Sequence, residues 1–231
     1  MFIGDIMKYT TLLFDSDDTL LDFGKAEKQA LSVTLSSFAP NCGDEIVAKY
    51  KEINRGLWAA YEKGEITRDD IFSRRFAETF AYFGVTLPDI DIADFYQTKL
   101  SECHELMDGT EEVLSSLYGR FDMHIITNGK KSTQERRLHE SGIEKYFGKI
   151  FISEDLGTQK PAAKYFDIVF DTLGISRDEA LIIGDSYTSD ITGGISAGVD
   201  TCWLNHKGRT EYDKRPTYEI KKLTELLEIL K

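Results

Sequence analysis

The chain has 231 residues, of which 41% are hydrophobic and 29% are charged, and its formal net charge is −12. This composition is typical of a globular protein that buries a core as one large or two small domains, and the acidic balance argues against a nucleic-acid polymer or an anionic membrane as partner. The sequence has no apolar run of about 18 residues and no signal-peptide pattern at its start. Its three cysteines lack the spacing of metal ligands. Together these features predict a cytoplasmic protein. Residues 1–6 precede a second methionine, Met7, and we assign them no role.

The first predicted strand is the apolar run Thr11–Phe14, and it ends in a cluster of acids. Asp15, Asp17 and Asp18 follow it directly. Three carboxylates this close repel one another unless a cation or a phosphate chemistry needs them. The alternative interpretation is an ordinary turn, in which Asp and Ser cap the following helix.

A purely helical segment follows this strand. The apolar spacing predicts four helices, at residues 25–38, 44–62, 68–83 and 90–105. Thr67 and Asp70 have the spacing of a capping box at the start of the third helix. Four helices inside an otherwise alternating chain predict an inserted all-helical domain over residues 22–104.

The remaining chain alternates between strands and helices. Further strands are predicted at residues 123–126, 149–152, 180–183 and 201–204. Helices are predicted at residues 110–117, 132–141, 162–173 and 218–230. This alternation predicts an α/β fold, a Rossmann-like parallel sheet core flanked by helices, built from residues 1–21 and 105–231.

Three later strands also lead into residues suited to phosphate or metal. Thr127 and Asn128 follow the second strand, Lys160 lies after the third, and Asp185 and Asp190 follow the fourth. The carboxyl ends of parallel strands lie along one edge of the sheet, where ligands bind. We therefore expect these side chains to converge with the acids that follow the first strand.

The residue types at this edge suit phosphoryl transfer. A carboxylate can attack phosphorus and form an acyl phosphate, and a second carboxylate can protonate the leaving oxygen and then activate water. Magnesium prefers hard oxygen ligands, and a hydroxyl and a lysine can hold the remaining phosphate oxygens.

The motifs DSDDT, TNG, KP and GDSYTSD, in this order and spacing, resemble the four motifs of haloacid-dehalogenase (HAD) superfamily phosphatases. The resemblance covers the whole chain, including a helical cap inserted after the first motif. It implies a Mg²⁺-dependent phosphomonoesterase that works through an aspartyl phosphate. Asp15 would be the nucleophile and Asp17 the general acid/base, and both would contact the metal, Asp17 through its backbone carbonyl.

The same resemblance implies roles for the other motif residues. Thr127 and Asn128 would orient the phosphate, and Lys160 would neutralise charge between nucleophile and phosphate. Asp185 would bind Mg²⁺ directly, and Asp190 would bind it through water or steady the site.

Asp18 departs from the usual first motif, which has Gly at this position. The DxDDT form, the following LLDF and the stretch INRGLWAAYEKGEITRDDIFSRRF are similar to the YjjG/YfnB-type pyrimidine 5′-nucleotidases of the superfamily. This resemblance implies pyrimidine nucleoside 5′-monophosphates as substrates. We expect a monomer or a homodimer. The alternatives are a phosphatase or phosphomutase acting on sugar phosphates or other small phosphometabolites and, more remotely, a phosphate-accepting signalling module without turnover.

The helical insert is expected to act as a hinged lid, because an acyl phosphate must be shielded from bulk water. Substrate choice would then depend on cap residues. Trp58 and Tyr61 share a helix face and could stack on a base, although aromatics at this spacing more often form the core of a helical bundle. Arg68, Arg74 and Arg75 could reach a phosphate or carbonyl, although a solvated surface position is the favoured interpretation for each.

Overall fold

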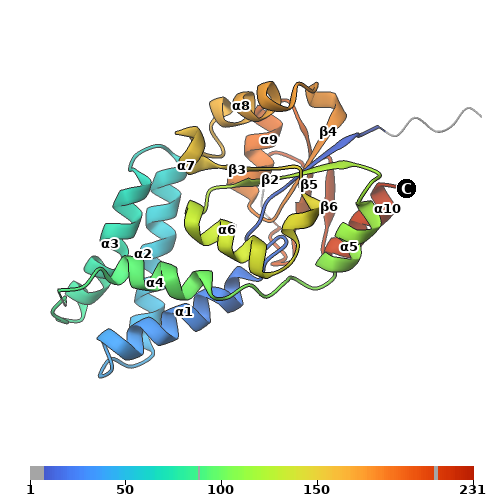
Figure 1. Cartoon of the computed structure of the whole chain (residues 1–231). Helices are drawn as coiled ribbons and strands as arrows, with labels where there is room; N and C mark the ends of the chain where they lie inside the picture. Colours follow the sequence, from blue (N-terminus) through green and yellow to red (C-terminus); the bar gives the residue numbers. More distant parts are fainter. Residues whose placement is uncertain (1–7, 88, 211–212) are drawn as a thin grey trace, which may run out of the picture. The chain divides into compact units, whose positions relative to one another are not determined.

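The computed structural model describes residues 8–87, 89–210 and 213–231 (Figure 1). Residues 1–6, to which the sequence assigns no role, lie outside this range. The chain divides into two compact units, one made of residues 1–23 with 104–231 and the other of residues 24–103. Among the described residues, no helix combines the length and the apolar character needed to span a membrane.

The larger unit is built on a six-stranded sheet in the order β3-β2-β1-β4-β5-β6, and all five pairings are parallel. The strands are β1 (Thr11–Phe14), β2 (Asp122–Thr127), β3 (Lys149–Ile152), β4 (Ala180–Gly184), β5 (Asp200–Leu204) and β6 (Tyr218–Ile220). The first strand lies in the middle of the sheet, between β2 and β4. The predicted α/β fold with a parallel sheet is confirmed.

Helices cover both faces of this sheet, because alternate residues of β1 point to opposite sides. Leu12 and Phe14 belong to a core cluster that also contains side chains of α5 and the segment after β6. Leu13 belongs to a second cluster, which α8 completes with four buried side chains. The helices of this unit are α5 (Thr110–Leu117), α6 (Lys131–Glu140), α7 (Ser153–Leu156), α8 (Ala163–Leu173), α9 (Gly193–Ser196) and α10 (Leu226–Ile229), with one π-helical turn at Tyr187–Thr192 and 3₁₀ turns at Glu144–Tyr146, Arg177–Glu179 and Leu223–Glu225.

The prediction of one helix over residues 218–230 is wrong. The segment Tyr218–Ile220 instead forms β6, which pairs with Cys202–Leu204, and helical structure begins only at Leu223. Ile220 and Leu223 are buried in the same core cluster. The prediction that these apolar side chains dock on the core is therefore right, and only the helical backbone at residues 218–220 is wrong. Tyr and Ile favour strands, and pairing with β5 satisfies backbone groups that an isolated helical turn would leave open.

The smaller unit is helical and contains α1 (Phe23–Phe38, from Gly24 onward), α2 (Glu45–Glu62), α3 (Arg68–Tyr82) and α4 (Ile92–Ser101). Its core is aromatic: the ring of Tyr50 lies 4.8 Å from that of Phe76 and 5.9 Å from that of Tyr96. The predicted capping box is confirmed, since Thr67 accepts from the backbone of Asp70 and the Asp70 side chain accepts from the backbone of Thr67.

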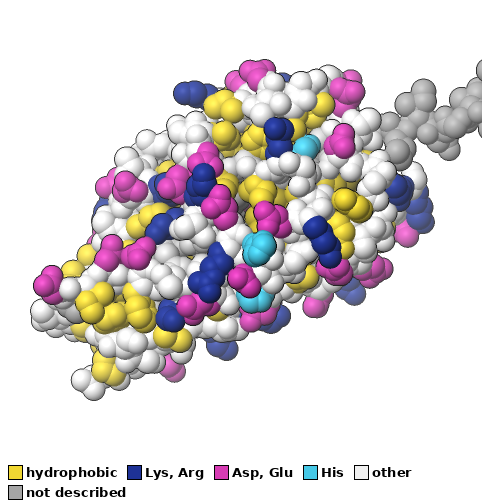
Figure 2. All heavy atoms as spheres, viewed as in Figure 1, with side chains coloured by type: hydrophobic (Ala, Val, Ile, Leu, Met, Phe, Trp, Pro, Cys, Tyr) yellow, Lys and Arg dark blue, Asp and Glu magenta, His cyan; other side chains and the backbone are white. Residues whose placement is uncertain are grey.

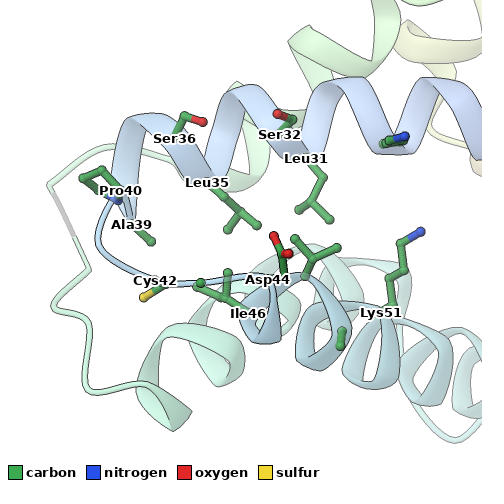
Figure 3. Close-up of a pocket in the computed structure, with 14 residues that line it drawn as sticks. Leu31, Ser32, Leu35, Ser36, Ala39, Pro40, Cys42, Asp44, Ile46 and Lys51 are labelled. Atoms are coloured by element: carbon green, nitrogen blue, oxygen red, sulfur yellow. The ribbon is translucent and has the colours of Figure 1, made fainter.

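The helical unit contains a hollow of about 600 Å³ between α1 and α2 (Figure 3). Leu31, Leu35 and Ile46 form its apolar wall, and Ser32 and Lys51 also line it. All of its lining residues belong to this one unit.

Charged side chains are spread widely over the molecule. On the face of the described residues seen in Figure 2, Asp and Glu are scattered among Lys and Arg, and the basic side chains there form no continuous surface. This distribution agrees with the acidic net charge and gives that face no electrostatic track for a polyanion.

Candidate active site

A buried ammonium group lies at the carboxyl edge of the sheet. The Lys160 Nζ donates to Asp15 Oδ1 at 2.8 Å, to Asp190 Oδ1 at 2.6 Å and to the Ile126 carbonyl at 2.8 Å. Lys160 is 1% exposed and Asp190 0%, so these are ion pairs in a water-excluded environment. Three strands supply the partners, since Asp15 follows β1, Ile126 lies in β2 and Asp190 lies just beyond β4.

Three carboxylates lie close together at this edge, and the Lys160 ammonium contacts two of them, Asp15 and Asp190. One oxygen from each of Asp15, Asp185 and Asp190 lies within 4.8 Å of the other two. Burial, together with repulsion from Asp190 and Asp185, raises the pKa of Asp15 well above its usual range, and burial also raises the pKa of Asp190. Burial alone would lower the pKa of Lys160, but the carboxylates of Asp15 and Asp190 raise it instead. The excess negative charge and the hard oxygen donors fit a small divalent cation such as Mg²⁺.

Hydrogen bonds fix the two acids at the ends of β1 and β4 relative to each other. Thr19 Oγ1 donates to Asp15 Oδ2 at 3.2 Å and accepts from the Asp185 backbone N–H at 3.1 Å. The indole Nε1 of Trp203, on β5, donates to the Asp185 carbonyl at 2.9 Å. Thr19 is the last residue of the DSDDT motif, but no role was predicted for it, and Trp203 lies outside all four motifs.

Asn128 is engaged with the backbone of Lys160. Its Nδ2 donates to the Lys160 carbonyl at 2.9 Å, and its Oδ1 accepts from the Lys160 N–H at 3.0 Å. Thr127 is 1% exposed at the end of β2, and its Oγ1 accepts from the Gly129 N–H at 3.1 Å. Asn128 therefore positions the loop that carries Lys160, while phosphate orientation by Thr127 and Asn128 stays a prediction.

The Asp17 carboxylate is held by a different element from the one that holds Asp15. Its Oδ2 accepts from Gln134 Nε2 at 2.5 Å, and its Oδ1 forms an ion pair with Arg137 Nη1. Both partners come from α6. Sequence reasoning missed them: their spacing of three residues on the helix after the TNG motif places them on one helix face, but it does not show that this face meets the first motif.

Asp18 has a left-handed backbone, with φ +56°, which explains why Gly is common at this position in the resembling family and why Asp can replace it. Its Oδ2 accepts from Lys207 Nζ at 2.8 Å, and the same ammonium donates to Asp185 Oδ2 at 2.9 Å. Burial would raise the pKa of Asp185, but the His206 imidazole, whose Nε2 lies 3.7 Å from Asp185 Oδ2, and the charge of Lys207 together lower it. The loop after β5 thus supplies a cationic partner, Lys207, that the sequence did not reveal.

The residues predicted for substrate choice lie in the helical unit. Tyr61 is 6% exposed and packs with Leu57 and Ile71, and Trp58 is partly buried against this cluster. The Arg68 guanidinium lies 5.9 Å from the ring centroid of Phe72. These positions favour the bundle-core interpretation for Tyr61, and a substrate role for Trp58, Tyr61 and Arg68 remains a prediction.

The surface interpretation is wrong for one of the neighbouring arginines. Arg75 is only 2% exposed, and its guanidinium lies 4.6 Å from the ring centroid of Tyr96 and 5.0 Å from that of Phe72. Arg74 is exposed and pairs with Glu78 at 2.7 Å. The aromatic core of the bundle accommodates the Arg75 cation through contacts with the faces of its rings. The residue type alone did not suggest this buried position.

Comparisons of the sequence and of the structure with known proteins point to the same family. Residues 12–204 match the model of the haloacid dehalogenase-like hydrolases. The chain is 44% identical to the HAD-hydrolase YfnB of Bacillus subtilis, with 96% of each chain covered. The crystal structure of that protein bound to magnesium, which reveals interdomain movement, superposes with a TM-score of 0.91 over 96% of this chain and 99% of the other.

Two further relatives are named for their substrates. The chain is 37% identical to the pyrimidine 5′-nucleotidase PynA of Streptococcus pneumoniae, covering 97% of this chain and 96% of the relative. It is 31% identical to the pyrimidine 5′-nucleotidase YjjG of Escherichia coli, covering 97% and 99%.

Proposed function

Because the chain belongs to the haloacid dehalogenase-like hydrolase family and is a phosphoric monoester hydrolase, we propose that it hydrolyses pyrimidine nucleoside 5′-monophosphates through a phosphorylated Asp15. The observation that carries the mechanism is the buried Asp15–Lys160–Asp190 cluster. The similarity to two pyrimidine 5′-nucleotidases over nearly the full length supports the substrate.

In the first proposed step, a carboxylate oxygen of Asp15 attacks phosphorus as the bond to the leaving 5′-oxygen breaks. The Lys160 ammonium on Asp15 Oδ1 offsets the charge that accumulates between nucleophile and phosphoryl group. Asp17 donates a proton to the leaving oxygen, so the product departs as an alcohol.

In the second step, Asp17 accepts a proton from water, which attacks the phosphorus of the phosphorylated Asp15. The P–O bond to Asp15 breaks, inorganic phosphate leaves and the free carboxylate is restored. Asp17 is suited to both transfers because its side chain is 29% exposed, whereas Asp15 lies deeper, at 11%.

Mg²⁺ is the proposed cofactor. Asp15 and Asp185 would hold it, with the backbone carbonyl of Asp17, and Asp190 would steady the site or bind through water. When bound, the ion would neutralise phosphate charge and polarise the phosphoryl group. Thr19 serves this arrangement by bridging Asp15 and the backbone of Asp185.

The test is phosphate release from a panel of phosphomonoesters with and without Mg²⁺. The panel holds pyrimidine and purine 5′-monophosphates, sugar phosphates and 4-nitrophenyl phosphate, and Asp15→Asn is the control. We expect magnesium-dependent release that favours the pyrimidine nucleotides and is lost in Asp15→Asn. A preference for sugar phosphates would overturn the substrate, and undiminished release by Asp15→Asn would overturn the nucleophile.

A further inference from the structure

Arg137 is a buried cation on the face of α6 that points toward the first motif. The residue is 0% exposed, and its Nη1 forms an ion pair with Asp17 Oδ1. A buried guanidinium is costly unless a partner compensates for its lost hydration. Asp17, by contrast, keeps 29% of its side chain exposed, so the cation supports the carboxylate from the protein side and leaves the other side open.

Gln134 lies one helical turn before Arg137 and contacts the other oxygen of the same carboxylate. It is 1% exposed, and its Nε2 donates to Asp17 Oδ2 at 2.5 Å. Its Oε1 in turn accepts from Ser16 Oγ at 3.2 Å. The amide is therefore oriented by Ser16, which fixes the direction in which its N–H groups point.

These two contacts use both oxygens of Asp17 and come from one rigid element. A carboxylate held at each oxygen by a separate donor cannot rotate freely about its side-chain bonds. The nucleophile has its own, separate partners in Lys160 and Thr19. The two acids of the first motif are thus fixed independently, one by the Lys160 loop and one by α6.

We propose that Arg137 and Gln134 are positioning residues for the general acid/base Asp17, which they hold in the orientation needed to pass a proton to the leaving oxygen. This inference rests on the proposed function. It assigns α6 a part in the reaction that the four recognised motifs do not include.

The consequence is a dependence on the leaving group. A nucleoside 5′-alkoxide is a strong base that leaves only with a proton, whereas 4-nitrophenolate is a stable anion that leaves without one. Loss of Asp17 positioning must therefore slow the first step for the nucleotide much more than for the aryl ester. A general loss of folding or of phosphate binding would slow both alike.

The experiment compares kcat/KM for uridine 5′-monophosphate and 4-nitrophenyl phosphate, because kcat/KM reports the steps through the first phosphoryl transfer. The variants are Arg137→Met and Gln134→Met, with Arg137→Lys as the conservative substitution and the exposed neighbour Arg136→Ala as the matched control. We expect Arg137→Met and Gln134→Met to lower kcat/KM for the nucleotide by about 100-fold or more and for the aryl ester by less than about 10-fold. Arg137→Lys should recover part of the loss, and Arg136→Ala should match wild type.

Equal losses for the two substrates, or wild-type values in both Met variants, would overturn the inference. If Arg137→Met does not fold, Gln134→Met, which removes no charge, carries the same comparison. The proposed function fails separately, because then the wild-type protein itself would release no phosphate from either ester.

A double-mutant cycle gives a second test. In an Asp17→Asn background, Arg137→Met should lower the residual kcat/KM for the nucleotide by less than about twofold, because its effect acts through the carboxylate that is already gone. A further loss as large as in the wild-type background would show that Arg137 acts by another route.

Discussion

Asp18 combines an unfavourable backbone conformation with a useful side chain. Its φ of +56° lies in the left-handed region, which costs an L-residue other than Gly about 1–2 kcal/mol, less for Asp and Asn. The carboxylate places the Lys207 ammonium beside Asp185. The residue that departs from the usual motif therefore adds a cation next to a proposed metal ligand.

We predict that Asp18→Gly is more stable than Asp18→Ala by about 1 kcal/mol, because only Gly relieves the backbone strain while both variants lose the Lys207 contact. The measurement is the free energy of unfolding from urea denaturation of both variants and wild type. Equal stabilities would mean that the left-handed conformation is not strained in this loop.

Lys207 and a divalent cation draw on the same carboxylate oxygen, Asp185 Oδ2. We predict that Lys207→Ala binds Mg²⁺ more tightly than wild type, by about two- to tenfold, because no ammonium competes for that oxygen. Isothermal titration calorimetry with MgCl₂ measures the difference, and Lys221→Ala, which changes an exposed lysine on the segment after β6, is the control for net charge. Unchanged or weaker Mg²⁺ binding would contradict the expectation.

At the scale of elements, α9 packs unusually close to the sheet. A Cβ on Gly194 would lie 2.6 Å from Thr201 Cγ2 and 2.9 Å from Ile182 Cδ1. Thr201 and Ile182 are both 0% exposed, so neither can move away without disturbing β4 and β5. Gly56, in the interior of α2, has no atom within 4 Å of such a Cβ.

We predict opposite effects for the same substitution at these two positions. Gly194→Ala should destabilise the α/β unit by about 1–3 kcal/mol through overpacking, and Gly56→Ala should stabilise the helical unit by about 0.5–1 kcal/mol through helix propensity. Trp203 lies in the α/β unit and Trp58 in the helical unit. In variants that keep only one of the two tryptophans, fluorescence during urea denaturation therefore measures the unfolding of each unit separately. Stabilisation by Gly194→Ala would show that α9 shifts easily on the sheet.

How far the sequence predicts these elements depends on the length of the pattern. The apolar run before Asp15 and the run before Asp185 identified two central strands, because such runs end abruptly in polar residues. The short Tyr218–Ile220 strand was missed because three residues are too few to show the alternation of a strand. The apolar residues that follow them have helical spacing, which dominated the pattern. Arg137 was missed for a different reason: which face of a helix meets the first motif is a property of tertiary packing, not of local sequence.

At the scale of the whole molecule, the α/β unit is discontinuous, and its two segments meet where the helical unit is inserted. The Asp22 N–H donates to the Glu105 carbonyl at 2.8 Å, and Leu21 and Leu106 form an antiparallel bridge. A short linker can therefore replace the insert without stretching the sheet.

We predict that replacing residues 24–103 with a short Gly-Ser linker abolishes the preference for pyrimidine nucleotides, because substrate choice is assigned to the helical unit. Hydrolysis of 4-nitrophenyl phosphate should persist at a reduced rate, since the residues proposed for catalysis all lie in the α/β unit. The ratio of kcat/KM for pyrimidine and purine nucleotides is the measurement. A folded deletion variant that keeps the wild-type ratio would place specificity in the α/β unit instead.

The central position of β1 has a consequence for biosynthesis. During translation Thr11–Phe14 is made before the other strands of the sheet, and Thr11 pairs with Asp122 and Ala180. This apolar strand therefore has no sheet partner until β2 has been made. Residues 24–103, which form a compact unit of their own, are made before β2 and β4. We therefore expect the nascent chain to be most vulnerable to aggregation, and most dependent on chaperones, while β1 is still unpaired.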